Sequence, residues 1–110
     1  GGKAPIDADV RVESATPVPI NISATLTIAD GYVPDTVRAS VTQRLDEYLK
    51  SIPFGDDDPA QRVVRYVRIG QTILDTSGVL DYSGLTVNGG TANVQIGKQE
   101  VAVLGTVSLT

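Results

Sequence analysis

The sequence contains no Cys, His, Met or Trp, and these absences exclude several kinds of functional site. Without Cys there is no disulfide, no thiolate nucleophile and no cysteine-bound metal. Without His there is no zinc site of the usual kinds, no Ser-His-Asp triad and no imidazole base near neutral pH. Aromatic residues are scarce, with four Tyr and one Phe, so the core must be aliphatic.

The absent Met has a separate meaning, because the chain begins Gly1-Gly2-Lys3. We interpret this start as the end of a processed or excised piece, and we expect one domain of a longer protein. Residues 1–8 lack periodicity and are expected to form a flexible entry. Residues 9–110 have the length of a single domain.

The charge balance argues against two classes of partner. Thirteen acidic and nine basic side chains give a net charge of −4, whereas nucleic-acid-binding modules are usually basic. The same acidity disfavours an anionic membrane surface. No apolar run in the sequence approaches the roughly 18 residues that span a bilayer. We therefore expect neither nucleic acid nor membrane as a partner.

The clearest strand is predicted at residues 20–28, where apolar and polar residues alternate. Its apolar face consists of Ile and Leu residues with one Ala. Its polar face consists of Asn21, Ser23, Thr25 and Thr27. This pattern is typical of a sheet that is covered on one side only.

Other strands are predicted on both sides of this one. Residues 9–15 alternate weakly and predict a short edge strand, and Pro17 and Pro19 argue against a central strand in the stretch between. Later strands are predicted at 79–88, with an irregularity at Ser83-Gly84, at 92–96 and at 104–109. The sequence Asn88-Gly89-Gly90-Thr91 predicts a hairpin turn rather than a phosphate-binding nest, because neither a helix nor a Lys follows it.

Two helices are predicted between these groups of strands. Residues 34–51 repeat apolar side chains every three or four positions, begin at a proline and end before another. Residues 68–76 predict a shorter helix with Ile69, Ile73 and Leu74 inward, after a β-like run at 63–67. The predicted fold class is α+β: a two-layer sandwich with two helices on one face of a mainly antiparallel sheet of about four to five strands.

Four stretches of the sequence, taken together, resemble a known family. They are residues 17–27, 31–37, 64–82 and 85–107, which include Gly-Val-Leu-Asp-Tyr and Asn-Gly-Gly-Thr-Ala-Asn. The chain resembles, over about residues 9–110, the C-terminal domain of baseplate J-like proteins, the Mu-type wedge proteins of contractile phage tails. Val33 and Val67 depart from the family pattern, which has a capping Asp and a capping Ser there.

The resemblance implies a virion structural protein of a phage, prophage or tailocin baseplate. It implies contacts with other wedge and hub proteins, assembly in the cytoplasm of the bacterial host, and no catalytic site or cofactor. We expect oligomers in the assembled baseplate and a monomer for the isolated domain. The alternative is a non-catalytic ligand- or glycan-binding accessory module of a larger secreted protein.

Two acidic patterns in the sequence resemble chemical sites. The run Asp56-Asp57-Asp58 invites a calcium interpretation, but consecutive Asp residues cannot all point inward and no EF-hand spacing is present. We therefore favour a solvated loop and no metal. The pairs Asp75 with Asp81 and Asp30 with Asp35 could serve a glycosidase. With so few aromatic residues to hold a sugar, we expect no enzyme.

Two surfaces are candidates for protein contacts. Arg62, Arg65 and Arg68 form a basic run that could dock an acidic neighbour, since Arg binds carboxylates with two donors. We favour the alternative, a solvated face that pairs with the nearby Asp loop. The polar strand face, Asn21 to Thr27, suits water or a modest polar interface. An unpaired strand at 9–15 or 104–110 could also add to a neighbour's sheet.

Overall fold

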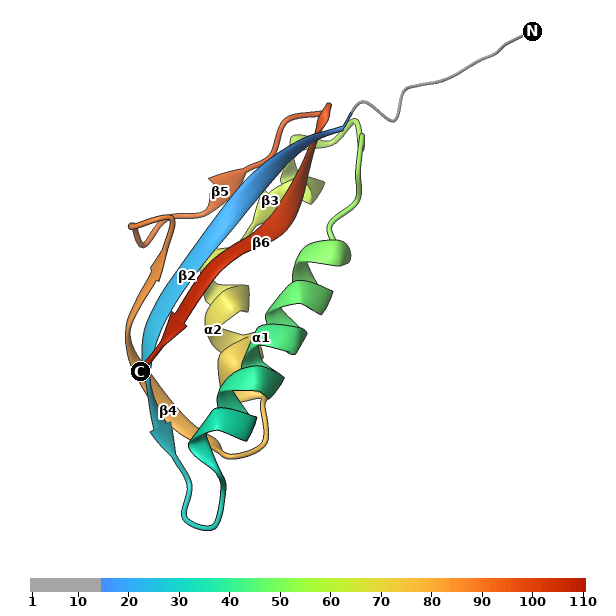
Figure 1. The fold of residues 1–110 in the computed structure, drawn as a ribbon. Coiled ribbons are helices and arrows are strands. Elements are labelled where there is room, and N and C mark those ends of the chain that lie inside the picture. The colour runs from blue at the N-terminus through green and yellow to red at the C-terminus, as the bar shows by residue number, and fades with distance from the viewer. Residues whose placement is uncertain (1–14) are drawn as a thin grey trace, which may run out of the picture.

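In a computed structural model that describes residues 15–110, two helices cover one face of a sheet (Figure 1). The elements are β2 (Thr16–Ile28), α1 (Pro34–Lys50), a 3-10 turn (Pro59–Gln61), β3 (Val63–Val64), α2 (Tyr66–Leu74), β4 (Val79–Val87), β5 (Val94–Gln95) and β6 (Glu100–Leu109). The predicted α+β class is confirmed. The predicted flexible entry at 1–8 and the edge strand at 9–15 lie outside the described residues, except for Ala15, which is not in a strand.

The strands of residues 15–110 form two sheets rather than one. The larger has the order β4-β2-β6, and β3 pairs with β5 in a separate two-stranded sheet. β2 is antiparallel to β4, and β3 to β5, whereas β2 and β6 are parallel. The predicted turn at Asn88-Gly89 does form, with Val87 N–H donating to the Gly90 carbonyl over 2.8 Å. The chain then leaves β4 and pairs with β3, which accounts for the smaller main sheet.

β2 begins before the predicted strand, and Pro17 and Pro19 lie inside it. β2 pairs with β4 only from Ile22 onward, and between Thr16 and Ile20 it pairs with β6 alone. Thr16 N–H donates to the Gln99 carbonyl, so residues 16, 18 and 20 point their backbone groups at β6. The two prolines, which have no N–H, therefore face the other edge of β2. They are tolerated in the strand because no described strand pairs with that edge there.

The core lies between this sheet and the helices, as the two periodicities predict. β2 contributes Ile20, Ile22, Ala24 and Leu26, which are buried at every second position. α1 contributes Val37, Val41, Leu45 and Leu49, which are buried at every fourth position. α1 packs on β6 and α2 packs on β4, with the two helices also in contact. None of the helices in the described part is both long and apolar enough to cross a membrane.

The second helix differs from the prediction at both ends. It begins at Tyr66 rather than residue 68, so Val67 lies in the first turn and Arg65 is the N-cap. Ile69 and Ile73 are buried, as predicted, but Leu74 is 44% exposed. The buried pair is spaced by four, and the next position is rotated about 100° away from that face. At the start of α1, Val33 makes no side-chain cap, in keeping with the missing Asp.

Candidate contact surfaces

The structure separates Arg62 from the other two arginines of the basic run. The Arg62 side chain is buried, with only 8% of the residue exposed. Its Nε donates to the Asp56 carbonyl over 2.7 Å, and its Nη1 donates to the carbonyl of Ile96. Arg62 thus ties the loop after α1 to the segment after β5. Arg62 therefore fits neither the docking surface nor the favoured solvated face, because it is buried and its donors are directed at the protein's own backbone.

Arg65 and Arg68 are exposed on the rim of a hollow between the end of α1 and the start of α2. The hollow has a volume of about 360 Å³, and Tyr48 and Pro53 also line it. Arg65 Nη2 donates to the Ala60 carbonyl over 3.0 Å, and Arg68 Nη1 lies 3.4 Å from Gln71 Oε1. A guanidinium group has five N–H donors, so both side chains retain donors that could bind a carboxylate.

The acidic loop directs its carboxylates at partners other than these arginines. Asp57 pairs with Lys98. Asp58 Oδ1 accepts the Ala60 N–H over 2.9 Å and so caps the 3-10 turn. Asp56 Oδ1 accepts the Asp58 N–H over 2.8 Å. The loop is therefore organised by local bonds, and residues 15–110 contain no group of three acidic side chains placed to hold a metal ion.

The polar face of β2 continues across the whole three-stranded sheet. Ser23 lies opposite Thr86 of β4 and opposite Ser108 of β6. Thr25 lies opposite Ser83, and its Oγ1 is 3.0 Å from that of Thr110. Register between distant strands brings these hydroxyl groups together. The sequence pattern of one strand therefore revealed only part of this surface.

Within this hydroxyl-bearing face, Asn21 has a structural role. Its Oδ1 accepts the Thr106 N–H over 2.9 Å, and its own N–H donates to Asn88 Oδ1 over 2.7 Å. The Asn21 side chain thereby fills the irregularity in the ladder between β2 and β6. Ser23 and Thr27 are exposed and remain available to solvent or a partner.

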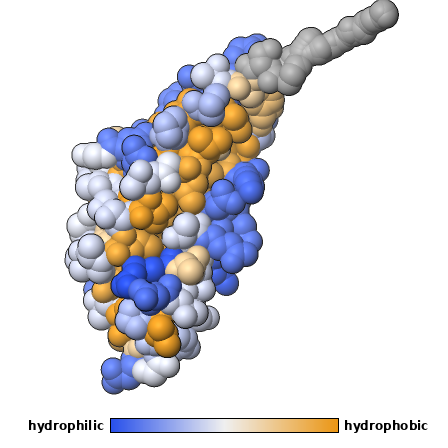
Figure 2. All heavy atoms as spheres, in the orientation of Figure 1, coloured by the Kyte–Doolittle hydropathy of each residue, from blue (hydrophilic) through white to orange (hydrophobic). Residues whose placement is uncertain are grey.

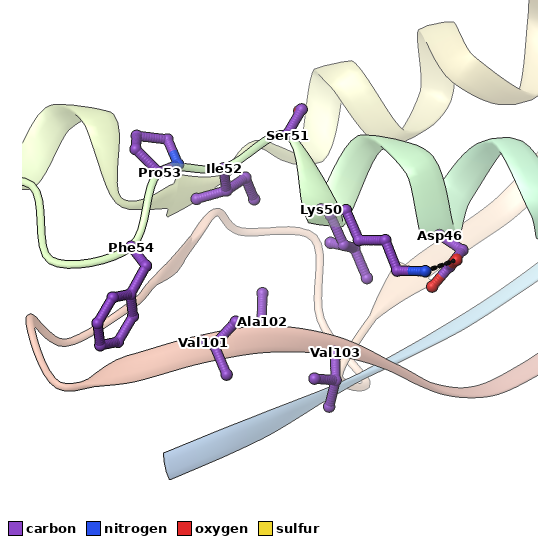
Figure 3. Close-up of a pocket in the computed structure, with 10 residues that line it drawn as sticks. Asp46, Lys50, Ser51, Ile52, Pro53, Phe54, Val101, Ala102 and Val103 are labelled. Atoms are coloured by element: carbon purple, nitrogen blue, oxygen red, sulfur yellow. Dashed lines mark ion pairs between the residues drawn. The ribbon is translucent and has the colours of Figure 1, made fainter. Parts of the chain in front are cut away.

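A third surface was not predicted. An apolar groove of about 460 Å³ runs between the end of α1 and the edge strand β6 (Figure 3). Its apolar lining consists of Leu49, Ile52, Pro53, Phe54, Val101, Ala102 and Val103. Figure 2 shows a continuous apolar stripe on this side of the molecule. The one sequence signal was Phe54, an aromatic residue directly after the proline that ends the helix.

The four carboxylates considered for glycosidase chemistry lie away from these three surfaces. Asp30, Asp35, Asp75 and Asp81 line neither the groove nor the hollow beside Arg65 and Arg68. Asp35 pairs with Arg38 one turn away, and Asp81 Oδ1 accepts the N–H of the next residue. The partners of these two carboxylates are thus local.

Comparison with known protein families shows the family to which the chain belongs. The family described as Baseplate J-like protein C-terminal domain matches residues 20–110. The chain belongs to this family. The match begins at the first buried residue of β2 and includes every later element, so the two-layer arrangement with its core belongs to the baseplate J-like domain.

Two curated relatives of this baseplate J-like domain come from Bacillus subtilis (strain 168). One is named Phage-like element PBSX protein XkdT and the other Uncharacterized protein YqbT. Each is 30% identical to this chain over 108 residues, which is 98% of the chain and 30% of the relative. The chain thus spans less than a third of the length of the curated relatives it matches. The resemblance inferred from the sequence motifs is confirmed.

Proposed function

We propose that this baseplate J-like domain is a structural assembly module of a contractile phage or prophage tail baseplate. In this proposal it is a component of the virion tail, assembled in the cytoplasm of the bacterial host, and it contacts neighbouring wedge and hub proteins. It works by holding shape, without a catalytic site or cofactor. The observation that carries the proposal is the family match over residues 20–110.

The arrangement of the domain supports a role in assembly. The helices cover one face of the sheet, and the hydroxyl-bearing face remains exposed for a neighbour. We further propose that residues 9–110 form one unit of a longer protein, since nearly the whole chain corresponds to 30% of its relatives. The domain would then present surfaces to its neighbours while the rest of the protein determines its place in the baseplate.

The position of the parent protein in tail particles tests this function directly. Purified particles carrying a tagged parent protein should show the tag at the baseplate by electron microscopy, in several copies per particle. Absence of the protein from particles would contradict the proposal. Saturable binding of the isolated domain to a glycan array, with no tag in particles, would favour the accessory-module alternative instead.

Within this function, we assign Arg65 and Arg68 to contact with an acidic neighbour. Both guanidinium groups border one hollow and are exposed, so a carboxylate could bind both. Charge reversal, Arg65→Glu with Arg68→Glu, should abolish incorporation of the parent protein into particles while leaving the unfolding curve unchanged. Arg44→Glu, at an exposed arginine of α1, is the matched control. Normal incorporation of the double variant would exclude this contact.

A further inference from the structure

The apolar groove beside β6 points to a specific kind of partner contact. We propose that one extended strand of a neighbouring baseplate protein adds to the outer edge of β6 and places apolar side chains in this groove. The nature of the neighbour rests on the proposed function, whereas the mode of binding rests on the groove and the edge. The strand would gain backbone hydrogen bonds from β6 and apolar burial from α1.

The groove exposes apolar surface that the domain itself does not cover. Leu49 and Ala102 are buried at its floor, whereas Phe54 is 53% exposed. In Figure 3, Ala102 points toward α1, and Phe54 stands beside Val101 at one end of the groove. Contiguous exposed apolar surface of this kind is typical of binding sites.

The edge of β6 carries backbone groups that match an added strand. β6 pairs with β2 and with no other strand of the described part. Because Ala102 is in register with Val18 of the parallel partner, the backbone bonds to β2 are made by its neighbours, Val101 and Val103. The N–H and C=O of Ala102 therefore point outward, beside the groove.

The domain protects one strand edge and leaves this one unprotected. Pro17 and Pro19 remove the N–H groups from the free edge of β2, which prevents pairing there. From Val101 to Leu109, β6 has neither a proline nor a charged residue. Long edges without prolines or charges tend to pair with another chain. The unprotected edge of β6 is therefore consistent with an edge that a partner covers in the assembly.

The charges around the groove indicate an uncharged occupant. Lys50 Nζ lies 2.9 Å from Asp46 Oδ2 at the groove wall, and Lys98 pairs with Asp57 near the start of β6. These ionic groups are matched within the domain, so none of them requires a charge on the partner. A strand that alternates apolar residues toward α1 with polar residues toward solvent is complementary to such a site.

A second copy of the chain fits the groove poorly. Antiparallel pairing of two β6 edges would place the strands about 4.8 Å apart. α1 packs against β6, so the two α1 helices would meet on the same face of the joined sheet. Packed helices need about 8–10 Å between their axes. A single strand without its own covering helix avoids this clash.

Two substitutions in the full-length parent protein test the proposal. Ala102→Pro removes the outward N–H and leaves the bonds to β2 in place. Phe54→Glu puts a charge at the groove without changing the backbone, and it decides the matter should Ala102→Pro unfold the domain. Both should reduce incorporation into tail particles at least tenfold at unchanged cellular protein level. Leu80→Glu, at an exposed apolar residue on the opposite edge strand β4, should incorporate normally.

Normal incorporation of Phe54→Glu would overturn the proposal and leave the proposed function intact. Loss of the wild-type parent protein from particles would instead contradict the function itself. Amide hydrogen exchange can report whether the edge of β6 is covered, and it does not require the partner to be identified. The amides of Ala102 and Leu104 should exchange fast in the 110-residue chain and slowly in assembled particles.

Measurements on the isolated 110-residue chain distinguish the other occupants. The proposal requires a monomer in sedimentation and fast exchange at Ala102. A dimer that Phe54→Glu dissociates would identify a second copy and overturn the proposal. Slow exchange in the monomer would also overturn it. If Val10→Asp with Val12→Asp made that exchange fast, the occupant would be the segment 9–15 of the same chain.

Discussion

Asn93 Oδ1 accepts a hydrogen bond of 2.8 Å from the backbone N–H of Tyr66, the first residue of α2. Arg65, the N-cap itself, makes no side-chain cap. Asn93, a loop residue distant in sequence, thus accepts the N–H bond that a helix cap would otherwise accept. The Tyr66 hydroxyl also donates to the Leu85 carbonyl over 2.7 Å, so the start of α2 is bonded to segments on both sides of the turn after β4.

We expect Asn93→Ala to lower the free energy of unfolding by about 1 kcal/mol, the usual cost of a lost helix cap. Asn93→Asp keeps an acceptor at the same place and should cost much less. Urea unfolding followed by circular dichroism measures both. Equal losses in the two variants would show that the amide contributes something other than the cap.

Gly78→Ala should destabilise the domain by about 3 kcal/mol, from left-handed backbone strain and overpacking together. Gly78 has φ +93°, and an added Cβ would lie 2.8 Å from Val37 Cγ2 and 2.7 Å from Tyr32 Cδ2. Gly89 has φ +78° with no atom within 4 Å of such a Cβ. Gly89→Ala should therefore cost only the strain, about 1 kcal/mol. Thermal unfolding of both variants measures the difference between the two losses of stability. The two losses should be equal if small movements of Tyr32 and Val37 make room for the added methyl group at Gly78.

Truncation of Leu45, which is fully buried, should cost about 2–5 kcal/mol because Leu45→Ala leaves a cavity under α1. Leu74→Ala removes the same atoms from a residue that is 44% exposed. Its cost should stay below about 1 kcal/mol. Comparable denaturant midpoints for the two variants would restore Leu74 to the core, where the sequence pattern had placed it.

Replacement of Arg62 tests its structural role. Arg62→Met keeps much of the apolar stem but removes the charged donor from the carbonyls of Asp56 and Ile96, of which Ile96 keeps a bond from Gln95 Nε2, at a cost of about 2 kcal/mol. Arg65→Met, at the exposed rim, should change stability by no more than about 0.5 kcal/mol. Chemical denaturation at matched pH compares them. An equally small loss of stability in Arg62→Met would contradict the structural role and make Arg62 a candidate for the docking surface again.

The features that the sequence predicted well are those with a local period. The burial of alternate residues in β2 and of every fourth residue in α1 follows from strand and helix geometry alone. The proline at the start of α1 and the glycine turn after β4 are likewise local signals. Residue identity is sufficient where neighbours in sequence determine the conformation.

The remaining features depend on which distant segments meet, and no short pattern specifies that. The parallel pairing of β2 with β6 decides which edges stay open and places β6 residues such as Ala102 in one groove with Phe54. Arg62 belongs to the same three-residue spacing as the exposed Arg65 and Arg68, yet its side chain is buried and donates to the distant carbonyl of Ile96. Pro17 and Pro19 argued against a central strand, and that prediction is wrong, because both lie in β2 and pair with β6. Only the register shows that their missing N–H groups face an edge of β2 that is unpaired there.

The parallel ladder between β2 and β6 has a consequence for how the domain forms. Its two strands are separated in sequence by both described helices and by β3, β4 and β5, so the central ladder cannot close early in synthesis. Until Glu100–Leu109 has been made, β2 lacks a partner on that side, and its apolar face has an incomplete cover. Contacts between such distant segments slow folding. The core of the domain therefore stays incomplete until β6 has been made. During this time chaperones or assembly partners have access to β2.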